Sequence, residues 1–146
     1  SPSDHLILNE GEFLRYINNA LDFAEANNAL VALGIKPHRP DTGYGYIQYL
    51  TEEKAPGVNK VKTFTEKPNL ELAKTFLESG DFLWNAGIFI WSNSSILAAF
   101  DQYLHDMYTT FKNEAHNYNT PNEIEAIKKV YSQCTNISID YGILEK

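Results

Sequence analysis

Hydrophobic and polar positions alternate along the chain with two different periods, and each change of period marks an expected element. Apolar side chains three or four positions apart predict an amphipathic helix over residues 12–27, capped by Asn9 and with Glu12 in capping-box position. Shorter apolar runs over residues 30–35 and 43–50 are typical of strands. The chain therefore opens with a helix that is followed by two strands.

A strand, a helix and a second strand follow in the middle of the chain. Residues 58–65 alternate as a strand does, and residues 70–79 predict a helix between the cap Asn69 and the stop Gly80. Residues 83–91 form a dense apolar strand. Strand, helix and strand within about 30 residues is the size of a βαβ unit. Ligands of α/β folds bind where such strands meet their loops.

The remainder of the chain is mostly helical in pattern. Residues 93–100 and 104–115 predict two helices, and Thr-Pro-Asn-Glu at 120–123 is a strong start for a third helix that reaches about residue 131. Residues 136–140 predict a short strand that ends at an aspartate. Because strands and helices alternate, we expect an α/β fold with a mixed, mostly parallel sheet flanked by helices.

Length and charge limit the classes of function. The 146 residues are enough for one domain with a real core, which we take to span residues 1–146. A net charge of −7 and a pI near 5.0 argue against a nucleic-acid partner. A few local cations could still bind one small phosphorylated ligand.

Cysteine content and hydropathy bear on the compartment. Cys134 is the single cysteine, which rules out an internal disulfide and fits a cytoplasmic location. No apolar run approaches the roughly 20 residues of a membrane span, so no membrane partner is expected. The first residue is Ser1 and not Met, so we expect that the natural N-terminus is not included.

Three polar residues lie where the central strands meet their loops. Lys67 follows a strand, beside Glu66, and could bind a phosphate as a compact positive charge; a solvated Lys–Glu pair is an equally good interpretation. Asn85 is polar within an apolar strand. A buried amide needs partners, and either a ligand hydroxyl or a nearby loop would serve.

Asp4 and Asp140 each lie beside a short apolar run and could together supply oxygen ligands to Mg²⁺. Taken alone, the pattern favours ordinary loop or capping aspartates. The four histidines lack the spacing of a zinc site, and Cys134 has no evident activating arrangement. The chain contains neither a nucleophile elbow nor a glycine-rich phosphate loop.

Five motifs in order carry a resemblance that covers nearly the whole chain. They are DHLI, LGIKPHRPDTGYGYI, FTEKP, FLWNAGIF and ISIDYGILEK. Together they resemble the sugar-1-phosphate nucleotidyltransferase family, and within it the mannose-1-phosphate guanylyltransferases. The resemblance implies a Rossmann-like nucleotidyltransferase fold that uses Mg²⁺ to transfer a nucleotide from GTP to mannose-1-phosphate, giving GDP-mannose and pyrophosphate.

The same resemblance assigns a role to each motif residue. Glu66 and Asn85 would hold sugar hydroxyls, and Lys67 would hold the sugar phosphate. Gly45 would let a backbone N–H meet the sugar. Asp4 and Asp140 would bind the metal, and with Lys67 they would make up the catalytic set.

These residue types suit the chemistry, because joining two phosphates requires positioning and charge neutralisation. The family's glycine-rich nucleotide segment should precede Ser1, so we expect the chain to supply the sugar-phosphate half of a longer enzyme and to be inactive alone. Most contacts to GTP would then lie in the missing segment, and a homo-oligomer is possible. Two alternatives stay open: a non-catalytic sugar-phosphate-binding or interaction module, and a transferase for another sugar or nucleotide.

Overall fold

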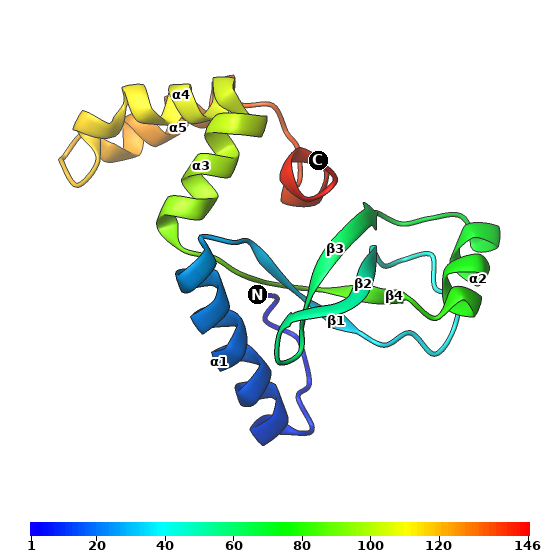
Figure 1. Ribbon diagram of the computed structural model, residues 1–146. Coiled ribbons are helices and arrows are strands. Elements are labelled where there is room, and N and C mark those ends of the chain that lie inside the picture. Colours follow the sequence, from blue (N-terminus) through cyan, green and yellow to red (C-terminus); the bar gives the residue numbers. More distant parts are fainter. The chain divides into compact units, whose positions relative to one another are not determined.

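A computed structural model describes all 146 residues, which form two compact units, residues 1–95 and 96–146 (Figure 1). The first unit contains, in chain order, α1 (Glu10–Asn27), β1 (Val31–Ile35), β2 (Tyr46–Ala55), β3 (Val58–Thr65), α2 (Leu70–Ser79) and β4 (Phe82–Ile90). The second unit contains most of α3 (Asn93–Tyr103), then α4 (His105–Asn113), η1 (Ala115–Asn117), α5 (Glu123–Gln133) and η2 (Asp140–Leu144). Each unit is described by itself.

The sheet of the first unit has the strand order β1-β4-β2-β3, and every neighbouring pair is antiparallel. The expectation of a mostly parallel sheet was therefore wrong, although the α/β class is confirmed. β3 and β4, joined by α2, do run in the same direction, as a βαβ unit requires. They are not neighbours, however, because β2 lies between them and pairs with both.

A long hairpin explains this arrangement. The sequence predicted that the strand would end at residue 50, but β2 continues through Ala55 and β3 starts at Val58, which leaves a two-residue turn. Gly57 in this turn has φ +74, a conformation that glycine adopts without the penalty of a Cβ. A turn this short forces its strands to be antiparallel. The tip reaches α1, where Asn19 donates a hydrogen bond to the carbonyl of Pro56 (3.1 Å).

Side chains alternate along β4, and the even-numbered ones make the core. Phe82, Trp84, Ala86, Ile88 and Ile90 are all buried, whereas the odd-numbered residues are half-buried. One end of this face packs with α1 through two buried alanines of that helix, and the other end packs with α2. Figure 1 shows the two helices at the two ends of the sheet. The opposite face of β4 is left for the candidate site.

The helices of the first unit begin and end where the sequence predicted. The Asn9 side chain accepts from the N–H of Glu12 (3.1 Å) at the start of α1, which begins two residues earlier than expected. The Asn69 side chain accepts from the N–H of Leu72 (2.9 Å) at the start of α2, and Gly80 ends that helix with φ +77. These signals are local, so the sequence alone was enough to locate them.

Helices are the only regular elements of the second unit, and the predicted strand over residues 136–140 is wrong. Residues 135–138 are irregular, and Asp140 begins the single-turn π-helix η2, in which the N–H of Glu145 bonds to the carbonyl of Asp140 (3.0 Å). A short run that alternates apolar and polar residues fits a strand only if a partner strand is available. None of the strands of the sheet pairs with it.

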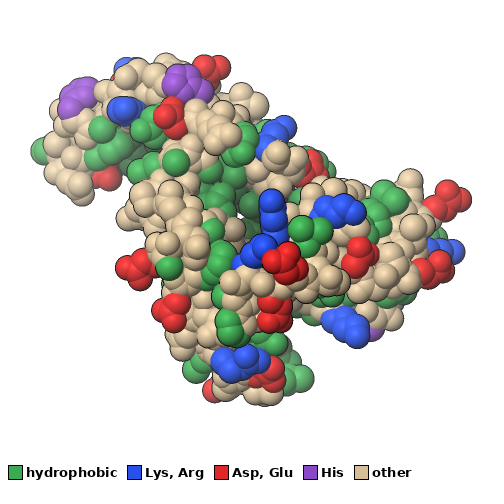
Figure 2. All heavy atoms as spheres, in the orientation of Figure 1, with side chains coloured by type: hydrophobic (Ala, Val, Ile, Leu, Met, Phe, Trp, Pro, Cys, Tyr) green, Lys and Arg blue, Asp and Glu red, His purple; other side chains and the backbone are tan.

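No helix in the structure has both the length and the apolar character needed to cross a membrane. On the face drawn in Figure 2, lysine and arginine side chains are interspersed with aspartate and glutamate.

Candidate functional site

The strand register brings three of the predicted residues together. Tyr46 of β2 pairs with Thr65 of β3 on one side and with Trp84 of β4 on the other. The next position along each strand is therefore Gly45, Glu66 or Asn85. The N–H of Asn85 donates to the carbonyl of Gly45 (2.8 Å), which confirms that the row continues across β2 and β4. Since side chains alternate, Glu66 and Asn85 point to the face opposite the buried Tyr46 and Trp84.

Gly45 leaves a space in the middle of this row. A Cβ at this position would lie 2.5 Å from Glu66 Oε2 and 3.4 Å from the Cβ of Asn85. The second distance is an ordinary van der Waals contact, but the first is far too short for one. Any side chain at residue 45 would thus displace the Glu66 carboxylate, so glycine is required by the space and not by its φ. The buried backbone of Gly45 therefore lies directly against the Glu66 carboxylate, with Asn85 beside it.

Lys67 turns back onto this row through an uncommon backbone conformation. Its φ of +44 lies in the left-handed region, which residues with a Cβ rarely adopt, and Pro68 follows it. The ammonium Nζ lies 3.2 Å from Glu66 Oε1. The Glu66 side chain is only 10% exposed, whereas that of Lys67 is 62% exposed. A buried carboxylate therefore lies at the base of the site, and an exposed cation lies at its rim.

Asn85 has a structural partner for its oxygen. Asn85 Oδ1 accepts a hydrogen bond from the N–H of Gly87 (3.0 Å), and Gly87 has φ +68. The β1–β4 pairing is irregular here, since two residues of β1 span four residues of β4. The bend thus fixes the orientation of the amide, with its oxygen turned toward the chain.

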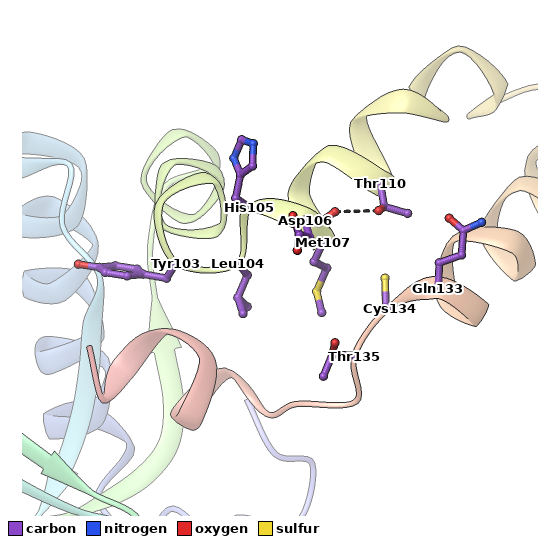
Figure 3. A pocket seen from close by; sticks show the side chains of 9 residues that line it. All are labelled: Tyr103, Leu104, His105, Asp106, Met107, Thr110, Gln133, Cys134 and Thr135. Atoms are coloured by element: carbon purple, nitrogen blue, oxygen red, sulfur yellow. Dashed lines mark hydrogen bonds between the residues drawn. The ribbon is translucent and has the colours of Figure 1, made fainter.

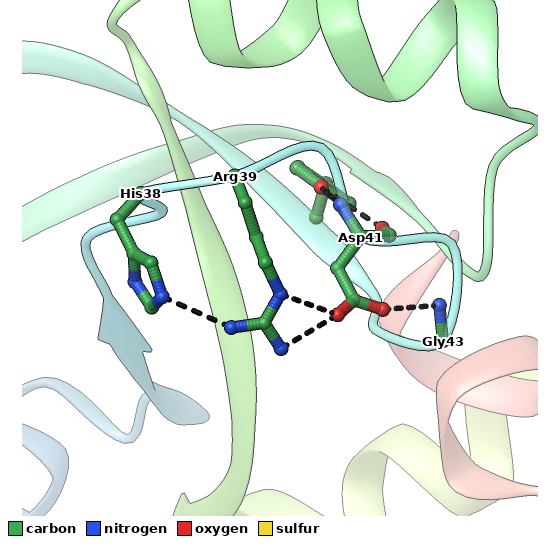
Figure 4. Close-up of polar contacts among 5 residues, drawn as sticks. His38, Arg39, Asp41 and Gly43 are labelled. Carbon is green, nitrogen blue, oxygen red and sulfur yellow. Dashed lines mark hydrogen bonds and ion pairs between the residues drawn. The ribbon is translucent and has the colours of Figure 1, made fainter.

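The loop that leads into Gly45 is held by side chains of its own (Figure 4). Asp41 Oδ2 accepts from both Nε and Nη2 of Arg39 (3.0 and 2.8 Å), and Asp41 Oδ1 accepts from the N–H of Gly43 (2.9 Å). The Gly43 N–H and then the Arg39 guanidinium hold the pKa of Asp41 below its ordinary value. His38 lies within 2.9 Å of the Arg39 guanidinium on its other side.

An aromatic group lies beside the same loop. The Trp84 ring meets His38 edge-on at 5.0 Å and Tyr44 at 5.1 Å, and the Arg39 guanidinium lies 5.3 Å from its centroid. Trp84 is buried, and its indole N–H has no hydrogen-bond partner. Cation and aromatic ring within about 6 Å attract each other, so this group adds to the attachment of the loop.

The two predicted metal residues belong to different units. Asp4 is exposed in the segment before α1, and Asp140 is half-buried at the start of η2. No cluster of three or more histidine, cysteine, aspartate or glutamate side chains forms a ready metal site. Two carboxylates with water and substrate phosphate are, however, the kind of ligand set that Mg²⁺ takes. The convergence of Asp4 and Asp140 on one ion stays a prediction.

Two hollows lie away from this row of residues. A groove of about 800 Å³ lies in the first unit beside α1, β1 and the β2–β3 hairpin. A smaller pocket of about 260 Å³ lies in the second unit, where Cys134 faces Met107 and Thr110 (Figure 3). Neither hollow is lined by Gly45, Glu66, Lys67 or Asn85. A search by cavity volume alone would therefore miss the residues that the strand pairing brings together.

Comparison with known proteins identifies the family of the chain. A family model described as nucleotidyl transferase matches residues 2–125. The chain belongs to the nucleotidyl transferase family. It is 37% identical to a mannose-1-phosphate guanylyltransferase of Escherichia coli over 99% of this chain, and 35% identical to one of Sinorhizobium fredii (strain NBRC 101917 / NGR234), also over 99%. It spans about a third of the length of these curated relatives, 32% and 28% respectively.

Comparison with solved structures gives a similar result. A crystal structure from Thermus thermophilus, described as a mannose-1-phosphate geranyltransferase, matches with a TM-score of 0.83 and 29% identity. The match covers 99% of this chain and 40% of that one. The antiparallel sheet with its flanking helices is thus a nucleotidyltransferase-like arrangement.

Sequence reasoning missed two features of this site. It named Lys67 but not its left-handed backbone, because a residue before proline favours extended conformations. It also passed over Asp41 and Tyr46, which hold the loop before Gly45. The only available signal was the position of Asp41 two residues before a glycine, a spacing typical of an Asx turn.

Proposed function

We propose that this chain supplies the sugar-1-phosphate site of a mannose-1-phosphate guanylyltransferase. The observation that carries the proposal is the row of Gly45, Glu66 and Asn85 across three strands, with Lys67 at its rim. A buried carboxylate and an amide suit sugar hydroxyls, because a sugar that lacks the matching hydroxyl leaves a buried group unpaired. The relatives' printed names support mannose as the sugar and guanine as the base.

In the proposed reaction, a phosphate oxygen of mannose-1-phosphate attacks the α-phosphorus of GTP. The new bond joins that oxygen to the α-phosphorus, and the bond from the α-phosphorus to the bridging oxygen breaks, so that pyrophosphate leaves. Lys67 neutralises the attacking phosphate, whose charge would otherwise repel the triphosphate. Glu66 and Asn85 orient the sugar, and Gly45 leaves room for the Glu66 carboxylate, which a side chain at position 45 would displace.

Asp4 and Asp140 would hold Mg²⁺, which when bound would neutralise phosphate charge. Their residue type fits the metal, and this part of the proposal rests on that fit and on the family resemblance. It is tested by titrating the chain with Mn²⁺ in the presence of mannose-1-phosphate and following paramagnetic broadening. Both aspartates should broaden together, and either Asp4→Ala or Asp140→Ala should abolish the effect at the other. Broadening of only one would exclude a shared ion.

Binding of the sugar phosphate is the direct test. We expect mannose-1-phosphate to shift the amide resonances of Gly45, Glu66, Lys67 and Asn85 in the ¹⁵N-labelled chain. Resonances of α5, in the other unit, serve as the internal control. Mannose without phosphate should bind more weakly, because it lacks the group that Lys67 contacts. If saturating mannose-1-phosphate leaves these four resonances unchanged, the proposal fails.

The two alternatives, another substrate and a non-catalytic module, can be distinguished by the same binding experiment together with an activity assay. Tighter binding of another sugar-1-phosphate would move the chain to a different substrate within the family. Assays of a full-length protein containing this segment, with several sugar-1-phosphates and triphosphates, would then identify the pair used. Binding without any turnover in that protein would favour a non-catalytic sugar-phosphate module. A cytoplasmic location and a homo-oligomer remain part of the proposal.

A further inference from the structure

We infer that Asp41 and Tyr46 are positioning residues that hold the Gly45 backbone in its place in the sugar-phosphate site. The inference rests on the proposed function and extends it to two side chains that do not themselves meet the ligand. Between them they close the segment from residue 41 to residue 46 into a small ring. Gly45 is part of that ring.

Tyr46 closes the ring from the side of the sheet. Its side chain is fully buried, and its ring packs on Phe76 of α2 at 5.3 Å. Its hydroxyl reaches back five residues, accepting from the N–H of Asp41 (3.0 Å) and donating to the carbonyl of Asp41 (2.9 Å). One rigid side chain therefore satisfies both backbone groups of one loop residue. Strand pairing fixes Tyr46 itself between Thr65 and Trp84.

Asp41 fixes the ring from within. Its carboxylate oxygen Oδ1 accepts from the N–H of Gly43 (2.9 Å), which sets the turn that leads to Gly45. Two of the residues in the ring, Gly43 and Gly45, are glycines, which lose the most conformational freedom when they are ordered. Without these contacts the segment would sample many conformations. A site whose backbone is already ordered spends less binding free energy on ordering it.

Arg39 makes a smaller contribution to the same loop. It pairs with Asp41 Oδ2 through two nitrogens, but its side chain is 52% exposed. Exposed ion pairs contribute little because water screens them. The bonds of the Tyr46 hydroxyl, which are partly buried and less screened, therefore outweigh the ion pair. If the hydrogen bonds position the loop, loss of the Tyr46 hydroxyl should matter more than loss of the Arg39 charge.

The test measures mannose-1-phosphate affinity together with backbone order in the ¹⁵N-labelled chain. Tyr46→Phe and Asp41→Ala should each weaken binding roughly tenfold, the effect of one or two hydrogen bonds. Asp41→Asn, which keeps an oxygen for the Gly43 N–H, should rescue most of the loss. Arg39→Ala should change the affinity by less than about threefold. In Tyr46→Phe, the order parameter of the Gly45 amide should fall from a rigid value near 0.85 toward 0.6.

Matched controls isolate the loop. Tyr118→Phe removes a partly buried hydroxyl that donates to the carbonyl of Phe111 (2.9 Å) in the other unit, and it should leave affinity unchanged. Asp81→Asn changes an aspartate that bonds to Gln48 (2.7 Å) and should also leave it unchanged. If Tyr46→Phe does not fold, the surface change Asp41→Ala gives the same answer.

The outcomes separate this inference from the function on which it rests. A wild-type chain that does not bind mannose-1-phosphate overturns the proposed function, and the inference with it. A wild-type chain that binds, with unchanged affinity and unchanged Gly45 order in both Tyr46→Phe and Asp41→Ala, overturns the inference alone. Lower affinity with an undisturbed Gly45 amide also overturns it, because positioning acts through that backbone.

Discussion

Lys67 combines a strained backbone conformation with an ammonium group that is a candidate for binding phosphate. A left-handed conformation costs a residue with a Cβ roughly 1–2 kcal/mol, and Lys67 is held there with φ +44. Strained residues of this kind cluster at functional sites, where the surrounding structure holds them in place. Glycine would avoid the strain but would lose the ammonium. Stability alone would therefore favour glycine, and not lysine, at position 67.

Two substitutions at this position separate strain from charge. Lys67→Ala and Lys67→Gly should weaken mannose-1-phosphate binding alike, by on the order of 10–100-fold, since both lose a charge-assisted contact. The glycine variant should nonetheless be about 1 kcal/mol more stable than the alanine variant. Isothermal titration and urea unfolding measure the two effects. Lys74→Ala, an exposed lysine of α2, is the control; equal binding by wild type and both variants would remove Lys67 from the site.

Asp41 gives the site a dependence on acidity. Its pKa is lowered, first by the Gly43 N–H and then by Arg39, so its contribution to stability is present above the unfolded-state pKa. That contribution is lost as the pH falls through the folded-state pKa. The Gly43 amide resonance should titrate with a midpoint below about 3.9, the ordinary aspartate value. Arg39→Ala should raise the midpoint only part of the way, and a wild-type midpoint at or above the ordinary value would contradict the assigned contacts.

Glu66, Lys67, Asn85 and Gly45 could be named from sequence because they lie at the ends of recognisable strands or in family motifs. The ring closed by Tyr46 could not be named, because a buried tyrosine hydroxyl leaves no local pattern. Its partner is the backbone of Asp41, which has the same donor and acceptor in any residue other than proline. The side chains of the candidate site could thus be predicted from the sequence, whereas those that hold its loop could not.

At the scale of elements, caps and periodicity located the helices of the first unit to within two residues, because these signals are local. Strand direction was wrong because it depends on which strands become neighbours. The two-residue turn at Pro56 and Gly57 makes β2 and β3 antiparallel, and β2 then separates β3 from β4. Alternation of helix and strand along the chain contains no such information.

The cap of α2 starts a helix that packs on the buried face of the sheet through Ala73 and Phe76. Asn69→Ala removes the bond to the N–H of Leu72 and should destabilise the protein by about 1 kcal/mol. Asn69→Asp, which keeps an accepting oxygen, should cost much less. Asn18→Ala, at an exposed position inside α1, should be neutral or slightly stabilising because alanine is the better helix former. Urea midpoints followed by circular dichroism measure all three, and equal midpoints for Asn69→Ala and Asn18→Ala would exclude a role for the cap.

At the scale of the whole molecule, the chain contains the residues of the proposed sugar-phosphate site but no glycine-rich phosphate loop. We therefore expect the 146 residues, mixed with GTP, mannose-1-phosphate and Mg²⁺, to bind the sugar phosphate and release no pyrophosphate. A coupled pyrophosphate assay measures this, with the E. coli relative as the positive control. Release at roughly 1 per second or faster, a rate typical of enzymes, would show that the nucleotide site is complete in this chain.

The aromatic group beside the loop gives the chain an optical probe of its own. Trp84 is one of two tryptophans; the other, Trp91, stacks on Phe89 at 5.8 Å, so Trp91→Phe leaves a single indole beside the loop that leads into Gly45. His38 of the loop meets that indole edge-on at 5.0 Å, so a movement of the loop would change the surroundings of the indole. The intrinsic fluorescence of the Trp91→Phe chain would therefore report the state of the loop in a cuvette without a label, including its response when a sugar phosphate arrives.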